Sequence, residues 1–551
     1  MTRRVALDWR RVVVYVHRWL GIAGCLLFIA WFASGVVMMY ARMPSLSAQE
    51  RLQRLPALDL SAARLAPHEA AATAGFTPDS VRLGMLGDHP VYRFTAGGTW
   101  FTVRADTGDL LGELPQAEAL VLARQFMPEH AASMRYDRYL LDSDQWTLSS
   151  ALRPLMPLHR LTMGDAAGTA LYISALTGDP VMKTTRRERV WGYLGAVLHW
   201  LYFTPFRRDT ALWVDTIIWL SITGSVMCLS GIVWGLWRYS PSGRYRLRRE
   251  PSHSPYAGMM KWHHYAGLVF GLTTFTWIFS GLMSMTPWNW SPGTAPTRAQ
   301  REAVAGGPLS LDGVTLEGLR EGLAQIASVF PARELELTQF GGEPFLLAYR
   351  PPEAADETKW GNTDLPAFLA DGALDHRLVS LVTPSEGPRA GFEPARIEAA
   401  ATAAMPAVPI VDATWLDAYD AYYYDRTGAL PLPVLRTRYA DAEQTWLYLD
   451  PGRGVVVRKT ERLSRLERWL YHGLHSLDFP FLYDRRPLWD IVLIVLSLGG
   501  LVSTVTVLQP SWHRLRQHAR KWRARATRPH AADAVSASAA DRSSVRDTSG
   551  A

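Results

Sequence analysis

The residues of this chain with the clearest chemical potential are histidines that recur in a sequence repeat. His17 opens a mostly apolar stretch, and His263 opens a second one. The two stretches align without a gap at an offset of 263 − 17 = 246 positions, which also carries Trp31 and Ser34 onto identical residues. Each stretch has the roughly 20 apolar residues that are needed to cross a bilayer. An ionisable residue within a membrane span is a candidate for a functional role.

A second pair of histidines belongs to the other half of the repeat. His199 and His475 lie 475 − 199 = 276 positions apart, and many surrounding residues match at that offset. Each lies in a shorter apolar segment, within residues 191–206 or 469–483, that a proline interrupts. Segments of this length are expected to lie at the membrane interface or to re-enter the bilayer. The second pair should therefore lie near the opposite face of the membrane from the first pair.

Two histidines at matching depth in a duplicated structure are suited to share one metal ion. Neutral imidazoles from two equivalent helices bind one iron from opposite sides in a six-coordinate b-type haem. We therefore predict two haem b groups per chain, one held by His17 and His263 and the other by His199 and His475. Neighbouring histidines remain alternatives for His263 and His475, namely His264 and His472.

Residues near the histidines fit the same prediction. Gly21 and Gly267 follow their histidines by one helical turn and leave a shallow surface on which a flat macrocycle packs. Guanidinium groups bind carboxylates through paired hydrogen bonds, so arginines near the spans are candidates for the haem propionates. These arginines are Arg18, Arg207, Arg208, Arg485 and Arg486. Four histidines in outer loops have no partner in the repeat and are expected at the surface, namely His68, His89, His130 and His159.

The composition excludes several other kinds of chemistry. The 551 residues include only two cysteines, Cys25 and Cys228, and both fall in apolar stretches. A disulfide, a thiolate metal site and the Cys-x-x-Cys-His motif of c-type haem are therefore excluded. The sequence contains no phosphate-binding loop, dinucleotide fingerprint or nucleophile elbow. Electrons would have to come from a lipid-soluble donor such as a quinol or from a separate protein.

The net charge of +7 is concentrated in basic clusters. These clusters precede the first apolar stretch, lie between the second and third, and follow the fourth. This alternation is typical of the positive-inside rule, and it argues against nucleic-acid binding. We predict four spans in the lipid bilayer of a bacterial inner membrane, with both termini in the cytoplasm, at about residues 12–40, 212–237, 263–287 and 487–508. A cleavable signal peptide over residues 1–48 is less favoured because the second copy of this segment is internal.

The spans divide the chain into eight segments. In order, these are a cytoplasmic N-terminus with the first span (1–40), an outer domain (41–189), an interfacial segment with the second span (190–237), a basic cytoplasmic loop (238–262), the third span (263–287), a second outer domain (288–468), an interfacial segment with the fourth span (469–508) and a basic, disordered cytoplasmic tail (509–551). Each copy contains two spans, so both copies have the same orientation, and we expect a two-fold axis along the membrane normal. The second outer domain has 276 − 246 = 30 additional residues, which we place in loops such as 351–365 or 384–394.

The outer domains carry the signals of short antiparallel strands. Residues 91–94 and 99–103 alternate between apolar and polar side chains and are separated by Gly97-Gly98, which is typical of a hairpin. Strand-then-turn patterns recur at residues 170–178 and 446–454. We therefore predict an α-helical membrane protein with four transmembrane helices and two periplasmic α+β domains, arranged as an internal parallel duplication.

The motifs around the histidines also resemble a known family. The phrases His17-Arg-Trp-Leu-Gly21, His263-His-Tyr-Ala-Gly267 and Leu198-His199-Trp-Leu, with the Tyr-x-x-x-x-x-Gly turns, resemble the PepSY-associated transmembrane family over about residues 10–510. Within it, the chain looks most like bacterial inner-membrane ferric-siderophore reductases, a group that includes iron-regulated membrane proteins. The resemblance implies PepSY-like domains in the periplasm and haem-dependent reduction of a ferric siderophore or another iron chelate there. The turn at Ser174-Ala-Leu176 departs from the family pattern, which usually has an acidic residue at this place.

Two classes of function are therefore open. In the first, the chain is a transmembrane electron-transfer enzyme that reduces ferric iron outside the cytoplasm. In the second, it is a non-redox membrane protein whose PepSY-like domains bind or inhibit a periplasmic partner such as a protease. Only the first class requires haem, so the presence of haem distinguishes the two.

Overall fold

The described part of the computed structural model comprises residues 8–247, 249–351, 374–425 and 430–526. Most of the predicted loop 351–365 and the end of the predicted tail, residues 527–551, lie outside this part. The chain divides into two compact units, and each is considered by itself. Unit 1 comprises residues 1–32, 223–275 and 495–551, and unit 2 comprises residues 33–222 and 276–494.

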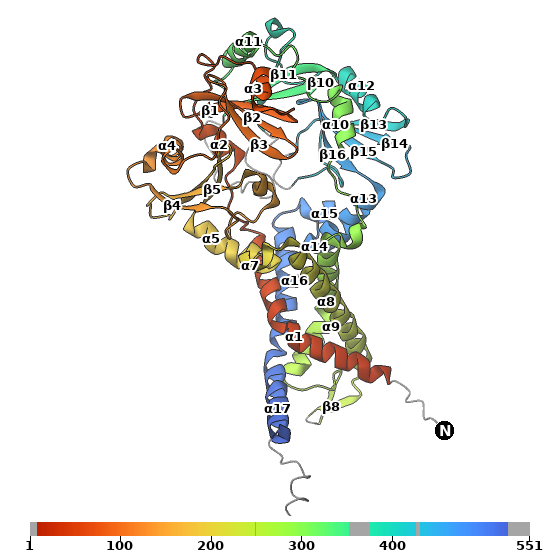
Figure 1. The fold of residues 1–551 in the computed structure, drawn as a ribbon. Coiled ribbons are helices and arrows are strands. Elements are labelled where there is room, and N and C mark those ends of the chain that lie inside the picture. Colours follow the sequence, from red (N-terminus) through yellow and green to blue (C-terminus); the bar gives the residue numbers. More distant parts are fainter. Residues whose placement is uncertain (1–7, 248, 352–373, 426–429, 527–551) are drawn as a thin grey trace, which may run out of the picture. The chain divides into compact units, whose positions relative to one another are not determined.

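Four helices are long and apolar enough to cross a membrane. They are α1 (Trp9–Met38), α8 (Thr210–Arg238), α9 (Met259–Ser284) and α16 (Leu488–Val505) (Figure 1). Their bounds lie close to those of the predicted spans. Large apolar side chains on them are exposed, as with Leu26, Trp219 and Val269. Helices that expose such residues are suited to an apolar surrounding, which agrees with the predicted membrane spans.

Unit 1 contains two elements that were not predicted from the sequence. The predicted disordered tail begins at residue 509, but α17 (Leu508–Ala526) is helical. The prediction was wrong because it overlooked an amphipathic pattern, in which Leu508, Trp512 and Leu515 recur at spacings of four and three among polar and basic residues. The predicted loop 238–262 contains a short hairpin, β8 (Tyr245–Leu247) with β9 (Glu250–Ser252).

The two copies of the repeat meet in one six-stranded antiparallel sheet in unit 2. Its strand order is β12-β11-β10-β1-β2-β3. The strands are β1 (Ser80–Leu86), β2 (His89–Ala96), β3 (Thr99–Arg104), β10 (Leu335–Phe340), β11 (Glu343–Tyr349) and β12 (His376–Ser380). At the centre, β1 pairs antiparallel with β10, and Arg82 lies opposite Glu336. Antiparallel pairing of two equivalent strands is what a two-fold axis through the sheet produces, so such an axis relates the two halves of this sheet.

The predicted hairpin of the first copy is confirmed. Strands β2 and β3 pair antiparallel, and the connecting residues Gly97 and Gly98 both have positive φ, at 56° and 80°. A two-residue hairpin turn of type I′ needs the left-handed conformation at both central residues, which glycine adopts without a steric penalty. The pair Gly97-Gly98 is therefore explained by the turn geometry.

Each copy also has a four-stranded antiparallel sheet of its own. The strand order is β4-β5-β6-β7 in the first copy and β13-β14-β15-β16 in the second. The strands are β4 (Arg135–Leu140), β5 (Leu158–Thr162), β6 (Ala170–Ser174), β7 (Pro180–Thr184), β13 (Ile410–Leu416), β14 (Val434–Tyr439), β15 (Trp446–Asp450) and β16 (Val455–Thr460). Figure 1 shows these two sheets on opposite sides of unit 2. The predicted α+β domains are thus joined by the shared six-stranded sheet.

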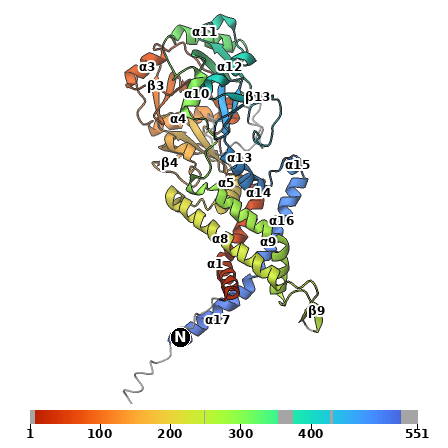
Figure 2. The same cartoon turned by 90° about the vertical axis from the view of Figure 1, so that its right-hand side faces the viewer.

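Short helices precede, connect and follow the strands of unit 2. They are α2 (Ala48–Arg54), α3 (Pro67–Ala74), α4 (Gln116–Phe126), α5 (Arg186–Gly192), α6 (Leu198–Trp200), α7 (Thr204–Arg207), α10 (Arg298–Ala305), α11 (Leu316–Ala327), α12 (Pro394–Ala404), α13 (Arg462–Arg468), α14 (Leu474–Ser476) and α15 (Pro480–Tyr483). One core joins Ala70 of α3 and Leu319 of α11 with Leu83 and Leu335 of the six-stranded sheet. Figures 1 and 2 both place α3 and α11 at one end of unit 2, with α5 and α14 at the other.

Equivalent residues of the two copies make the same contacts. Trp213 Nε1 donates to the carbonyl of Trp200, and Trp489 Nε1 donates to the carbonyl of Ser476, both at 2.9 Å. Both donors and both acceptors are related by the offset of 276 that the sequence repeat predicts. The repeat therefore extends from the sequence to individual hydrogen bonds.

Candidate functional site

His17 on α1 and His263 on α9 form the first pair, and both belong to unit 1. Their ring centres are 6.0 Å apart, and the ring planes are inclined by 26°. His17 Nδ1 is 3.0 Å from the carbonyl oxygen of Met227, and His263 Nδ1 is 2.8 Å from that of Ser503. These acceptors are equivalent at the offset of 276. A carbonyl oxygen only accepts, so in the neutral ring Nδ1 carries the proton and Nε2 keeps a lone pair for a metal ion.

Glycines around the first pair leave space where other residues would intrude. A Cβ at Gly231 would lie 2.4 Å from His17 Cε1, so the ring occupies a place that only glycine leaves open. A Cβ at Gly267 would meet no other helix of the described chain within 4 Å, and one at Gly21 would meet only Met227 Sδ, at 3.8 Å. This open space beside Gly21 and Gly267 fits the predicted packing surface for a macrocycle.

His199 and His475 form the second pair, and both belong to unit 2. Their ring centres are also 6.0 Å apart, but the ring planes are inclined by 77°. Ser34 Oγ lies 3.1 Å from His199 Nδ1, and Ser280 Oγ lies 3.0 Å from His475 Nδ1. The two serines are equivalent at the offset of 246. Serine side chains thus contact Nδ1 of both histidines of the second pair, and His475 Nδ1 also lies 3.2 Å from the carbonyl of Trp277.

A particular local backbone positions both histidines of the second pair. A π-helical turn, Tyr193–Val197 or Trp469–Gly473, comes shortly before each histidine. The short helix that follows ends at a leucine in the left-handed conformation, Leu201 with φ 54° or Leu477 with φ 52°. Non-glycine residues rarely adopt positive φ, so its recurrence marks a constrained backbone next to the histidines. The predicted interfacial segments are therefore short helices with a π-helical turn, a feature frequent at functional sites.

The geometry of both pairs fits one metal ion between two imidazoles. Two rings that share a metal through bonds of about 2 Å, with each ring centre about 1 Å behind its nitrogen, have centres roughly 6 Å apart. Both observed separations are 6.0 Å. Among the described residues, no three His, Cys, Asp or Glu side chains converge to hold a metal ion by themselves. A haem iron needs only two protein ligands because the macrocycle supplies the others, so a histidine pair is sufficient for haem.

The neighbouring histidines have different surroundings. His264 is buried, with Nδ1 2.8 Å from Ser254 Oγ and Nε2 2.8 Å from the carbonyl of Gly235. Both of its ring nitrogens are engaged within the protein, so the geometry favours His263 as the ligand. The ring of His472 lies against Tyr471, with ring centres 4.4 Å apart. In the second pair it is His475 that faces the partner histidine.

The arginines predicted to bind haem propionates fall into two groups. Three of them are held by other protein groups: Arg207 donates to Thr210, Arg208 donates to the carbonyl of Ser143, and Arg486 forms an ion pair with Asp490. The predicted propionate role of these three stays a prediction. Arg18 and Arg485 are exposed, and their predicted role stays a prediction.

One histidine expected at the surface is buried. His159 on β5 is only 3 % exposed, and its Nε2 lies 2.8 Å from the carbonyl of Leu114. The hydroxyl of Tyr136 lies 3.1 Å from Nδ1. The prediction was wrong because a histidine whose ring nitrogens are both hydrogen-bonded is buried at little cost. Burial lowers the pKa of His159, which favours the neutral ring.

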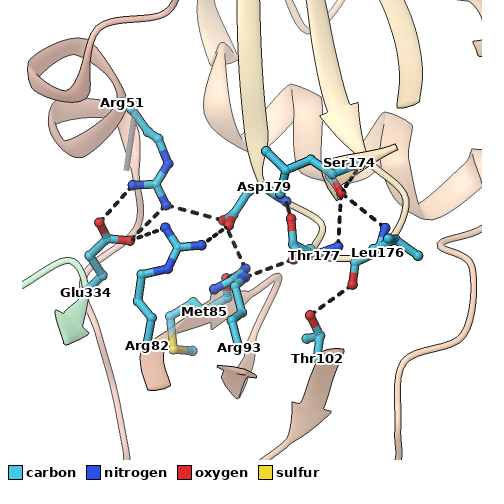
Figure 3. A network of polar contacts seen from close by, with 11 residues as sticks. Arg51, Arg82, Met85, Arg93, Thr102, Ser174, Leu176, Thr177, Asp179 and Glu334 are labelled. Carbon is cyan, nitrogen blue, oxygen red and sulfur yellow. Dashed lines mark hydrogen bonds and ion pairs between the residues drawn. The ribbon is translucent and has the colours of Figure 1, made fainter. Parts of the chain in front are cut away.

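A cluster of buried charges, in which Glu334 of the second copy joins four residues of the first, was not predicted from the sequence (Figure 3). Arg51 on α2 donates from two nitrogens to Glu334, at 2.8 Å each. Arg82 on β1 and Arg93 on β2 both pair with Asp179, which lies in the turn between β6 and β7. All five side chains are buried, and they comprise three cations and two anions.

The arginines of this cluster stabilise the charged form of Asp179. Burial alone would raise the pKa of Asp179, but Arg82, Arg93 and Arg51 outweigh it and hold that pKa well below its usual value. Burial lowers the pKa of Arg93 to about 10, and its Nε also donates to the carbonyl of Thr177 at 2.9 Å. Because these partners are protein groups, we interpret the cluster as a contact between the six-stranded sheet and sheet β4–β7.

Comparison with known proteins found no family model that matches the chain and no curated protein that is similar to it. The two histidine pairs and their surroundings are therefore the basis for a functional proposal.

Proposed function

We propose that the chain is a b-type haem protein of the bacterial inner membrane that transfers electrons across the membrane and reduces a ferric siderophore, or another ferric chelate, in the periplasm. The proposal depends on the two repeat-related histidine pairs, each with ring centres 6.0 Å apart. His17 and His263 would hold one haem, and His199 and His475 the other. Bound haem would supply reversible one-electron chemistry at each site.

The distribution of basic residues supports the topology of this proposal. Arg516, Arg520 and Lys521 on α17 are exposed, and arginines are also frequent in the segment 238–262. Lysine and arginine are enriched on the cytoplasmic side of membrane proteins, so both segments are assigned to the cytoplasm. The α+β domains of unit 2 are then periplasmic, and the second pair belongs to the same unit as these domains. A quinol or a separate protein would donate the electrons.

The chemistry of ferric chelates supports a periplasmic reductase. Fe(II) carries less charge than Fe(III), so hard oxygen ligands of a siderophore hold it less tightly. Reduction before transport across the inner membrane would release the iron. The resemblance of the histidine motifs to the ferric-siderophore reductases of the PepSY-associated family supports this substrate class.

The first test is the haem content of the full-length protein. After expression with ample haem supply, pyridine haemochrome analysis should give two b-type haems per chain. His263→Ala should remove one of them and His475→Ala the other, because each substitution deletes one of two ligands. The matched controls are His264→Ala and His472→Ala, which should keep both haems. A folded wild-type protein without haem would reject the proposal and favour the non-redox alternative, in which PepSY-like domains bind or inhibit a partner such as a protease.

The second test is the direction and specificity of the reaction. The dithionite-reduced protein in oriented vesicles should be reoxidised by a ferric siderophore offered on the periplasmic side, followed by stopped-flow absorbance. The iron-free and gallium-loaded forms of the siderophore are the controls, because neither accepts an electron at the metal. Equal rates with all three forms, or reaction only from the cytoplasmic side, would reject the siderophore-reductase assignment and leave haem binding unaffected.

A further inference from the structure

The two histidine pairs differ in the groups that lie at hydrogen-bond distance from Nδ1. In the first pair, the acceptors are the main-chain carbonyls of Met227 and Ser503. In the second pair, the hydroxyls of Ser34 and Ser280 lie 3.1 and 3.0 Å from Nδ1, and His475 Nδ1 has an additional, longer contact of 3.2 Å with the carbonyl of Trp277. Each pair contains one histidine from each copy of the repeat. The difference is therefore one between the two pairs and not between the two copies.

The contacts of Ser280 define the direction of its hydrogen bonds. Ser280 Oγ lies 2.9 Å from the carbonyl oxygen of Trp277, which only accepts, so the serine donates to it. The lone pair of the same oxygen then accepts from Nδ1–H of His475, at 3.0 Å. His475 Nδ1 is also 3.2 Å from the Trp277 carbonyl, a longer contact. Ser280 thus holds the ring and leaves Nε2 as the metal-binding nitrogen.

The acceptor of Nδ1–H tunes a histidine ligand. A partner that accepts this hydrogen bond strongly makes the imidazole more basic, and a more basic ligand stabilises ferric over ferrous iron. An amide carbonyl accepts more strongly than a hydroxyl. The second pair should therefore hold an iron with a higher reduction potential than the first pair does.

The inclination of the rings adds a second, independent difference. The planes of the first pair are nearly parallel, at 26°, and those of the second pair are nearly perpendicular, at 77°. In low-spin ferric haem, parallel ligand planes separate the energies of two iron d orbitals, and perpendicular planes make them nearly equal. Parallel planes therefore give a rhombic electron paramagnetic resonance signal, whereas perpendicular planes give a signal with a large maximal g value.

We propose that Ser34 and Ser280 are positioning residues that hold the second pair with crossed rings and give it the higher reduction potential of the two haem sites. The proposal rests on the haem function proposed above and makes the second pair the more favourable place for an electron. With this order of potentials, electron transfer from the first pair to the second pair is downhill.

The experiment uses the full-length, haem-loaded protein in detergent and combines a redox titration with electron paramagnetic resonance. The wild type should show one rhombic signal and one signal with a large maximal g value, the latter belonging to the component of higher potential. Ser280→Ala should lower the potential of that component and make its signal more rhombic, because Nδ1–H then turns to the Trp277 carbonyl. Ser34→Ala should change the same signal. Ser280→Thr keeps a hydroxyl, so its signal and potential should be those of the wild type and not those of Ser280→Ala.

The matched control is Ser503→Ala. Ser503 is also a serine beside a ligand candidate, but its main-chain carbonyl, not its side chain, accepts from His263. This substitution should leave both signals and both potentials unchanged. Two signals of the same type in the wild type, or a Ser280→Ala protein with the spectrum and potentials of the wild type, would overturn the inference. Either result would leave the haem content and the reductase reaction intact, whereas a protein without haem would reject the proposed function itself.

Discussion

The two copies of the repeat join their sheets with different chemistry. In the first copy, Arg82 and Arg93 of the six-stranded sheet pair with Asp179 at the turn of sheet β4–β7 (Figure 3). In the second copy, Leu347 of the six-stranded sheet and Leu449 of sheet β13–β16 belong to one apolar core. At these positions the contact between the shared sheet and the separate sheet is thus ionic in the first copy and apolar in the second, although His376 of β12 also contacts the carbonyl of Gly452 in the turn of sheet β13–β16.

The difference extends to individual positions. The turns after β1 and β10 align at an offset of 340 − 86 = 254, so Arg93 corresponds to Leu347. At the offset of 276, Asp179 corresponds to Val455. Both members of the Arg93–Asp179 pair are therefore apolar in the second copy, whereas Arg82 corresponds to Glu336. This agrees with the physical cost of burial, because one member alone would be an unpaired buried charge.

The supports of the histidines are alike in the two copies. Ser34 and Ser280 contact their histidines at 3.1 and 3.0 Å. The carbonyls of Met227 and Ser503 do so at 3.0 and 2.8 Å. The repeat thus keeps the contacts around the histidines, whereas the residues at the contact between the sheets differ between the two copies.

The largest effect is expected from removing the acid of the ionic contact. Asp179→Ala leaves Arg82 and Arg93 buried without this partner, which should cost about 3–5 kcal/mol of stability. The counterpart Val455→Ala removes two methyl groups at a half-buried position and should cost on the order of 1 kcal/mol. Thermal unfolding of both full-length variants in detergent, followed by tryptophan fluorescence, measures the difference. Equal destabilisation by the two substitutions would contradict the contrast between the copies.

The second-largest effect is expected from acidification, which should weaken the ionic contact. The pKa values of Asp179 and Glu334 lie below their usual values in the folded protein, because the neighbouring arginines outweigh the effect of burial. Their contribution to stability is therefore present above the pKa of the unfolded chain, about 4, and is lost as the pH falls toward the folded-state pKa. Unfolding midpoints between neutral pH and about pH 3 should fall less steeply in Asp179→Asn than in the wild type. Parallel pH profiles would contradict this assignment.

The smallest loss of stability is expected from the two tryptophan hydrogen bonds, and it should be the same in both copies. Trp213→Phe and Trp489→Phe each remove one hydrogen bond of 2.9 Å to an equivalent carbonyl. Each should cost about 1 kcal/mol, because a single hydrogen bond contributes about that much to stability. The two unfolding midpoints should coincide within the error of the measurement. A large difference between the two variants would mean that the copies differ here as they do at the sheet contact.

Local patterns in the sequence were sufficient to predict several elements. The apolar stretches predicted four long helices, and Gly97-Gly98 between alternating strands predicted the hairpin of β2 and β3. The helix α17 carries an equally local signal in Leu508, Trp512 and Leu515, and it was missed because its basic composition was taken for a disordered tail.

The sequence by itself also determined which residues belong together, because the two offsets match His17 with His263 and His199 with His475 before any fold is known. It could not determine the ring inclinations or the hydrogen-bond acceptors, since these come from residues such as Met227, which lies 227 − 17 = 210 positions from its histidine.

Only the tertiary structure decided the role of the arginines in the first copy. Val81-Arg82-Leu83 and Tyr92-Arg93-Phe94 alternate as strands do when their polar face meets water. Here the arginine-bearing face of the sheet is covered by the turn that carries Asp179, so Arg82 and Arg93 are buried and paired. Alternation reveals that a strand has two faces, but what covers the second face depends on residues distant in the chain.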